Sequence, residues 1–120
     1  MVGIDRLGGA FAIQGGGLPA GEPGEVCFLA PDDLQWMPCG LGHTAWVRWA
    51  LGGDVHGFYE ELRWPTWGED VRGLAPGQGL HAHPPPWTVE GRRGEVTRRP
   101  VPLLEAYGVL LQSSLRLRER

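Results

Sequence analysis

The fold is decided by residues 24–37, which read GEVCFLAPDDLQWM. Two apolar runs, at 26–30 and 34–37, flank Pro31-Asp32-Asp33, and proline followed by aspartate is typical of a turn. The stretch therefore predicts a β-hairpin in which Cys27 falls opposite Met37. One predicted face carries Val26, Phe28 and Trp36, and the other carries Cys27, Leu29 and Met37. Because both faces are apolar, this part of the sheet is either covered on both sides or lies beneath something missing.

A second hairpin is predicted before this one. Residues 2–6 and 10–14 flank Leu7-Gly8-Gly9, in which glycine supplies positive φ angles without steric cost. Residues 15–24 contain five glycines and two prolines, so we expect a loop between the two hairpins. The first third of the chain therefore predicts an antiparallel sheet of about four strands.

Helical patterns follow the predicted sheet. Residues 45–51 place tryptophans at helical spacing and end at Gly52-Gly53. Asp54 is expected to cap the next helix. The apolar stripe of that helix, which we expect to be buried, consists of Val55, Phe58, Tyr59 and Leu62. Thr66 and Glu69 have the spacing of a capping box, which predicts a short helix that runs to Leu74.

The last third predicts one strand and one helix. We expect a short strand at 80–83, ended by Pro84-Pro85-Pro86, and a mobile loop at 88–99, where the sequence is polar and irregular. Pro102 suits the first turn of a leucine-rich closing helix. The predicted fold class is α+β, with an antiparallel sheet of about four strands from the N-terminal third, central short helices and a C-terminal helix packed on the sheet.

Size and charge limit the classes of function. The chain has 120 residues and a mass of 13.1 kDa, so residues 1–120 are expected to form a single domain. Its net charge is -3: residues 1–90 carry four Arg against eleven Asp and Glu, and residues 91–120 carry seven Arg against three Glu. A nucleic-acid-binding protein has a basic surface interleaved with aromatic residues, so no nucleic-acid partner is expected.

The expected location is the cytoplasm. Residues 1–6 carry no basic segment before an apolar stretch, and no apolar run approaches the ~20 residues of a membrane span. We therefore expect no membrane partner. Cys27 and Cys39 are expected to be free thiols, as is usual in a reducing compartment.

No pattern in the sequence is typical of catalysis, of a cofactor or of a metal site. His81 and His83 alternate along a predicted strand, but no third ligand is evident. The triple glycine at 15–17 is not followed by the Lys-Ser/Thr of a phosphate-binding loop. Nucleophile and metalloprotease motifs are missing from the sequence. We therefore assign no catalytic, cofactor-binding or metal-binding residue, and an enzyme is the less favoured class.

The chain is rich in tryptophan, with six in 120 residues. A domain of this size is too small to bury all six, and exposed tryptophan with arginine is enriched at interface hot spots. The candidate partner-binding residues are Arg63, Trp64, Trp67 and Trp87. The alternative is that Trp46, Trp49 and Trp67 belong to the core and that Arg63 only covers an indole ring.

Several of these segments together resemble one uncharacterised bacterial family. They are residues 8–17 (GGAFAIQGGG), 24–36, the Phe58-Tyr59 pair, 63–67 (RWPTW), 84–88 and 99–102. The family is known only as domain of unknown function 2625, and the resemblance implies no reaction or substrate. Its members usually have a further region before the first hairpin, which this chain is expected to lack. A sheet left uncovered in this way would self-associate, so a homo-oligomer through the N-terminal hairpin is expected.

Two classes of function remain open. The layout of sheet, Pro-Asp turn and helices resembles, more loosely, the SUKH superfamily, which includes bacterial toxin-immunity proteins that act by binding. This likeness implies a non-enzymatic, immunity-like protein with a protein partner. The alternative is a small hydrolase or ligand-binding enzyme with a pocket near the glycine-rich loop at 15–24.

Overall fold

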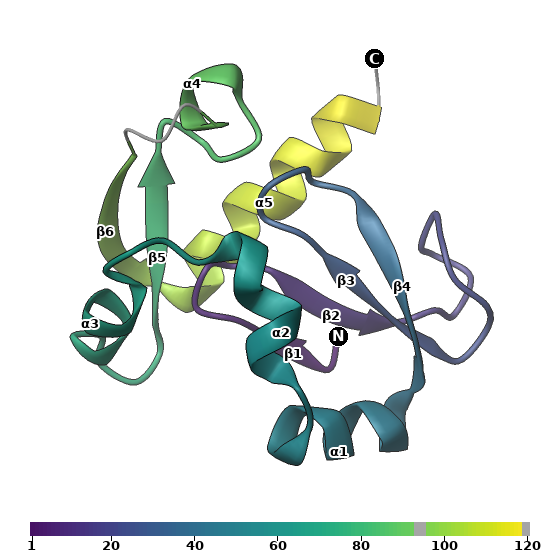
Figure 1. Cartoon of the computed structure of the whole chain (residues 1–120). Coiled ribbons are helices and arrows are strands. Elements are labelled where there is room, and N and C mark those ends of the chain that lie inside the picture. The colour runs from purple at the N-terminus through teal and green to yellow at the C-terminus, as the bar shows by residue number, and fades with distance from the viewer. Residues whose placement is uncertain (93–95, 119–120) are drawn as a thin grey trace.

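The structure is a computed structural model that describes residues 1–92 and 96–118. A four-stranded antiparallel sheet occupies the N-terminal part, in the order β1-β2-β3-β4 (Figure 1). Its strands are β1 (Gly3–Ile4), β2 (Ala10–Ile13), β3 (Glu25–Leu29) and β4 (Trp36–Gly42). Short helices and a C-terminal helix pack around this sheet, so the predicted α+β fold is confirmed.

One face of the sheet packs against three helical segments. They are α1 (His43–Gly52), α2 (Val55–Tyr59) and the 3-10 helix η1 (Glu60–Leu62). The buried residues of this face, Phe11, Val26 and Phe28, form the Phe11 cluster. Aromatic rings from the helices close over it, with the Phe28 and Phe58 ring centroids 5.1 Å apart and those of Phe11 and Trp46 also 5.1 Å apart.

The predicted helix at Asp54 is confirmed in part. The Asp54 carboxylate accepts a hydrogen bond from Gly57 N at 2.9 Å, as an N-cap should. Phe58 and Tyr59 pack against the Phe11 cluster but remain half-buried rather than fully buried. The helix therefore presents one side to this cluster and leaves His56 and Gly57 exposed.

The other face of the sheet packs against α5 (Leu103–Arg118). Its buried residues form the Ala10 cluster, which consists of Ala10, Leu29, Leu34 and Leu110. Trp36, Trp87 and Tyr107 pack against this cluster. The apolar character of both faces therefore corresponds to cover on both sides.

The pairing of β3 with β4 differs from the prediction by one residue. Leu29 pairs with Trp36 and Phe28 with Met37, so Trp36 and Met37 lie on the opposite faces to those predicted. The cause is Leu34, which has a φ of 60° and is only 4% exposed, and so belongs to the turn while its side chain enters the core. One extra turn residue moves every side chain of the following strand to the other face.

Both cysteines are free, as predicted. Cys27 lies beneath the glycine-rich loop, where its thiol donates to the Ala20 carbonyl at 3.4 Å. Cys39 instead packs against the Phe11 cluster. Cys27 pairs with Pro38 and not with Met37, as the one-residue difference in register requires.

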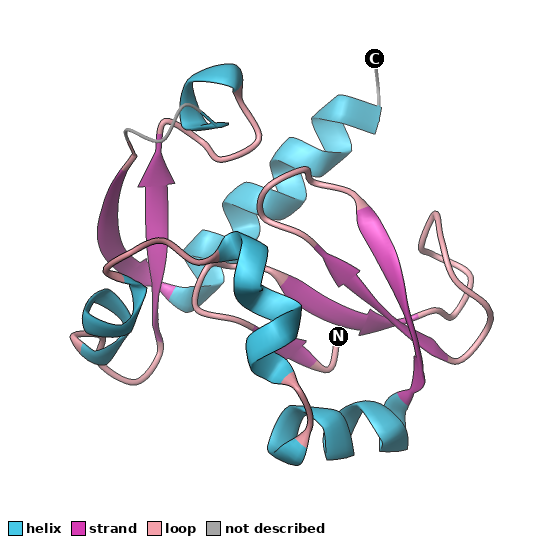
Figure 2. Cartoon of the chain, viewed as in Figure 1, coloured by secondary structure: helices cyan, strands magenta, loops and turns pink. Residues whose placement is uncertain are grey.

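A second sheet lies beside the first, built from β5 (Gln78–His83) and β6 (Thr97–Pro102) (Figure 2). The helices α3 (Trp67–Arg72) and α4 (Val89–Arg92) belong to this half of the molecule. The strand predicted at 80–83 is confirmed. The mobile loop predicted at 88–99 is wrong, because the described residues there form α4 and part of β6, while residues 93–95 lie outside the described part.

The predicted helix after Pro65 is confirmed as α3, but its capping box is wrong. Thr66 makes no capping bond to the backbone, and its hydroxyl donates instead to the Asp70 carboxylate at 3.0 Å. The two sheets are joined through Arg6, whose Nη1 donates to the Ala75 carbonyl at 3.0 Å and whose carbonyl accepts from Leu80 N at 2.6 Å. Among the described residues, no helix is long and apolar enough to cross a membrane.

Candidate functional site

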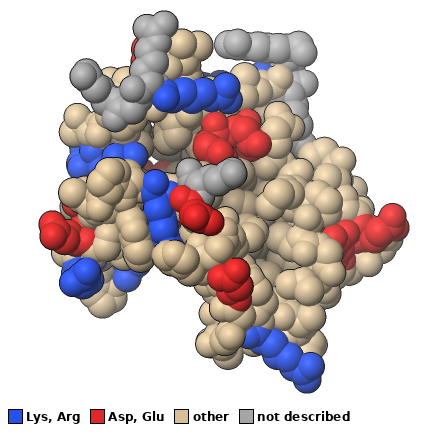
Figure 3. Space-filling view, viewed as in Figure 1, with Lys and Arg blue, Asp and Glu red and all other residues tan. Residues whose placement is uncertain are grey.

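A cleft of about 530 Å³ lies where the two sheets meet. Its volume falls within the range of about 300 to 1,000 Å³ that is common for ligand pockets. Figure 3 shows basic and acidic side chains around the hollow between the β5–β6 sheet and the turn after β3. The polar and aromatic residues of its wall are Asp32, Asp33, Arg63, Trp64, His81, Trp87, Arg92 and Arg98. Leu80, Val109 and Leu110 are among the apolar residues of the wall.

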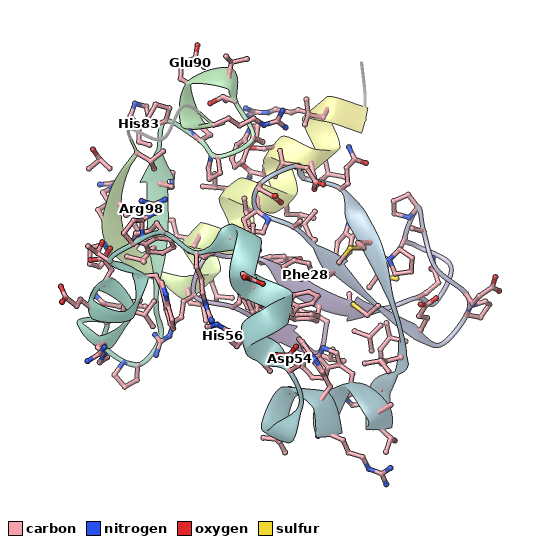
Figure 4. All side chains as sticks on the ribbon, in the orientation of Figure 1. Phe28, Asp54, His56, His83, Glu90 and Arg98 are labelled. Carbon is pink, nitrogen blue, oxygen red and sulfur yellow. The ribbon has the colours of Figure 1, made fainter. Side chains whose placement is uncertain are left out.

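Arg98 and Trp64 form a stacked pair at one end of the cleft. The Arg98 guanidinium lies 3.9 Å from the centroid of the Trp64 ring, a geometry that favours a cation–π interaction. Trp64 Nε1 donates to the Asp70 carboxylate at 2.6 Å, which fixes the orientation of the indole. Arg98 belongs to β6, in the second sheet, whereas Phe28 marks the core of the first (Figure 4). Burial lowers the pKa of Arg98, and the charge of Asp70 opposes this effect.

A second stacked pair lies next to the first. The Arg63 guanidinium is 3.9 Å from the centroid of the Trp67 ring and forms a hydrogen bond to His56 Nδ1. Arg63 lines the cleft, but Trp67 does not. Each arginine guanidinium is thus held against an indole ring.

The other end of the cleft is acidic. Asp32 and Asp33 come from the turn after β3, and Arg92 comes from α4. Partial burial and the neighbouring charge of Asp33 raise the pKa of Asp32, while the charge of Arg92 opposes the rise. The cleft therefore has acidic and basic ends with an apolar wall between them.

The structure brings together three of the four predicted partner-binding residues. Arg63 and Trp64, which are consecutive between η1 and α3, line the cleft together with Trp87, which lies between β5 and α4. Trp67 contacts the Arg63 guanidinium but does not line the cleft. The alternative interpretation holds for part of the set: Trp46 and Trp49 pack against the Phe11 cluster, and Arg63 does cover an indole. All six tryptophans are half-buried.

Five polar residues of the cleft were not predicted from the sequence as site residues. They are Asp32, Asp33, His81, Arg92 and Arg98. The aspartates stood out only as turn residues, and His81 only as a partner for His83. Arg98 fell in the segment predicted as a loop, so no sequence signal placed it opposite Trp64.

The glycine-rich loop is organised by one side chain and does not form a pocket wall. The amide of Gln14 donates to the carbonyls of Leu18 and Ala20 at 2.8 and 2.7 Å, and its oxygen accepts from Gly16 N and Leu18 N at 2.8 and 3.2 Å. Two loop amides that a phosphate would need are therefore already occupied. No residue of 15–24 lines the cleft. The cleft therefore does not lie near this loop, where a pocket was predicted.

The two histidines of β5 do not form a metal centre with other described residues. His81 lines the cleft, while His83 is exposed at the end of the strand (Figure 4). Within residues 1–92 and 96–118, no group of three or more His, Cys, Asp or Glu side chains is placed to hold a metal ion. The arrangement in the cleft suits ionic and aromatic contacts with a ligand.

Comparison with known proteins finds relatives without an assigned activity. The family described as protein of unknown function DUF2625 matches residues 1–106. The chain belongs to this family. It is 35% identical over 108 residues to the putative uncharacterized protein YbfG of Escherichia coli K12, an alignment that covers 90% of this chain and 49% of that protein.

An uncharacterized protein of Haemophilus influenzae Rd is 36% identical over 74 residues, which cover 62% of this chain and 32% of that protein. The chain thus spans about half or less of the length of these relatives. No solved structure matches it.

Proposed function

We propose that the chain is a non-enzymatic protein-binding domain and that the cleft between its two sheets is the contact surface. The main support is that three predicted partner-binding residues line one cleft, Arg63 and Trp64 from the segment after η1 and Trp87 from the segment after β5. Arginine and tryptophan dominate binding energy at interfaces because each combines a large contact area with directed polar groups.

The proposed mode of action is that of an immunity protein, which neutralises its partner by forming a stoichiometric complex. The looser likeness in layout to the SUKH superfamily favours this mode, as an analogy of fold. The proposed location is the cytoplasm, and the two free thiols favour a reducing compartment.

The test is co-expression of the chain with the protein encoded beside it, followed by size-exclusion chromatography with light scattering. We expect a stable complex of fixed stoichiometry that the Arg98→Gln variant weakens by about tenfold or more, since a hydrogen bond to a charged group contributes about 1.5 to 3 kcal/mol. Arg99→Gln is the matched control, because Arg99 is exposed on the same strand and does not line the cleft. A complex that tolerates both substitutions equally would place the contact surface elsewhere.

A small hydrolase or ligand-binding enzyme is the second candidate function. The observation in its favour is that Asp32, whose pKa is raised, and His81 line the same cleft. Hydrolysis of a panel of chromogenic esters that is lost in Asp32→Asn would favour this candidate over binding alone. Equal rates of hydrolysis in the unmodified chain and in Asp32→Asn would exclude Asp32 as a catalytic residue and count against this candidate.

Self-association through the N-terminal hairpin is a further proposal. Both faces of the first sheet are covered, so pairing would use the edge of β1. That edge is two residues long, and short edges are a common protection against pairing. Any dimer formed there is therefore expected to be weak.

A further inference from the structure

Among the described residues, the Arg98 guanidinium forms no hydrogen bond or ion pair with a carboxylate. Its guanidinium stacks on Trp64, and the acidic group that acts on it is Asp70. The Asp70 Oδ2 atom already accepts hydrogen bonds from Trp64 Nε1 at 2.6 Å and from Thr66 Oγ1 at 3.0 Å. A partly buried guanidinium costs free energy unless its N–H groups find an acceptor, and the planar fork of arginine matches a carboxylate.

The other charges of the cleft leave this end basic. Arg63 lies on the same wall, held by Trp67 and His56. Arg92 acts instead on Asp32 at the acidic end. Arg98 and Arg63 are therefore the two arginines of the cleft that do not act on Asp32.

The cleft that Arg98 lines also has an apolar wall. Leu80, Val109 and Leu110 line it, together with the Trp87 ring, which packs on the Ala10 cluster. A ligand that fills the cleft therefore needs an apolar group next to its charged group, since burial of apolar surface supplies about 25 cal/mol per Å².

We infer that the cleft receives an acidic segment of a partner protein, with a carboxylate on Arg98 and a neighbouring apolar side chain against the wall of α5. This inference rests on the proposed protein-binding function. A carboxylate carries one negative charge, whereas a phosphate carries about 1.5 to 2 at neutral pH, so Asp32 and Asp33 of the same cleft disfavour a phosphate more strongly. The favoured occupant is therefore a glutamate or aspartate flanked by an apolar residue.

The test uses an amide-capped leucyl-glutamate dipeptide and its leucyl-glutamine counterpart as probes. Titration is followed by NMR through the indole N–H of Trp64, which is assigned with a Trp64→Phe variant. We expect the glutamate probe to shift this signal and to bind about tenfold or more tightly than the glutamine probe, because only the former forms a charge-assisted hydrogen bond. Arg98→Gln should abolish the preference, and Arg99→Gln should keep it.

Equal binding of the two dipeptides, stronger competition by inorganic phosphate, or a preference unchanged in Arg98→Gln would each overturn the inference. The comparison of the two probes on the unmodified chain needs no variant, so it holds even if Arg98→Gln fails to fold. If a partner complex requires Arg98 but the two dipeptides bind equally, the protein-binding function stands and the inference of an acidic segment is refuted. Selective binding of the glutamate probe without any protein complex would support the carboxylate site and refute the protein-binding function.

Discussion

Replacing Tyr59 with phenylalanine removes one hydroxyl group from a network that ties α2 to the first hairpin. Tyr59 Oη donates to Asp5 Oδ2 at 2.8 Å. The other carboxylate oxygen, Oδ1, accepts from Leu7 N and Gly9 N, both at 2.9 Å, and so holds the turn between β1 and β2. The Tyr59→Phe variant therefore leaves one oxygen of this carboxylate without its donor.

The size of the effect follows from the charge of Asp5. A hydrogen bond to a charged group contributes about 1.5 to 3 kcal/mol, whereas a neutral one contributes about 0.5 to 1.5 kcal/mol. The ring of residue 59 remains, so its edge contacts with Phe28 at 6.2 Å and Phe58 at 5.0 Å are retained. We expect the variant to lose about 2 kcal/mol of unfolding free energy at neutral pH.

The loss should also depend on pH. Burial raises the pKa of Asp5 above its ordinary value of 3.8, and the hydrogen bond from Tyr59 opposes the rise. Because the folded-state pKa is the higher one, stability falls as the pH increases from the ordinary value through the folded-state value. Removal of the hydroxyl raises the folded-state pKa further, so the deficit of the variant grows across that window and is largest above it.

Urea denaturation of both proteins at roughly pH 3 and roughly pH 7 measures this difference. Tyr107→Phe is the matched control, since the Tyr107 ring packs against the Ala10 cluster on the other face of the sheet from the Phe11 cluster, and we expect a change below about 0.5 kcal/mol. A Tyr59→Phe deficit below about 0.5 kcal/mol at neutral pH, or one that is the same at both pH values, would refute the role given to this network.

Three further predictions concern the backbone, the glycine-rich loop and self-association. Gly8→Ala should lower the melting temperature more than Gly16→Ala does. Both glycines have positive φ, but only at Gly8 would an added Cβ meet the Ala106 backbone, at 2.6 Å. Equal losses in the two variants would count against this close approach. Gln14→Glu should cost about 1 to 3 kcal/mol in urea unfolding, because a carboxylate cannot donate to the two loop carbonyls, and a cost near zero would show that the loop does not need this side chain. Sedimentation velocity at micromolar concentration should detect weak dimers if the β1 edge pairs, whereas a single monomer species would eliminate that proposal.

Local sequence patterns predicted the first sheet and most helices, but one register depended on the tertiary structure. The hairpin around Pro31-Asp32-Asp33 was expected from turn chemistry alone. Its length was not, because Leu34 adopts a left-handed conformation that puts its side chain in the core. The Leu34 side chain packs with Leu110 of α5, and this contact favours the conformation. A contact between residues so far apart cannot be predicted from the local sequence.

The second strand of the second sheet, β6, was not predicted, for a different reason. β6 reads TRRPVP, and its two prolines and two arginines are typical of a loop. In a two-stranded sheet each strand has a free edge, where missing N–H donors are tolerated. Val101 pairs with Gly79 and is 6% exposed, and this burial holds the strand in place.

Three residues of the cleft were predicted from the sequence as partner-binding residues. Arg63, Trp64 and Trp87 stood out by composition. Asp32 and Arg98 lie far apart in the sequence, and they line one cleft only because Arg6 and α5 join the two sheets. Such pairings depend on the fold, and so the charged residues of the cleft could not be found from spacing.

Hydrogen–deuterium exchange of the chain, alone and bound to the protein with which it co-purifies, tests the proposed contact surface most directly. If the cleft is that surface, the backbone at 31–33, 62–64, 80–82 and 86–92 should become protected on binding. The glycine-rich loop at 15–24 serves as the internal control and should exchange as before, since none of its residues lines the cleft. Protection confined to that loop or to α1, with the cleft segments unchanged, would contradict the proposal.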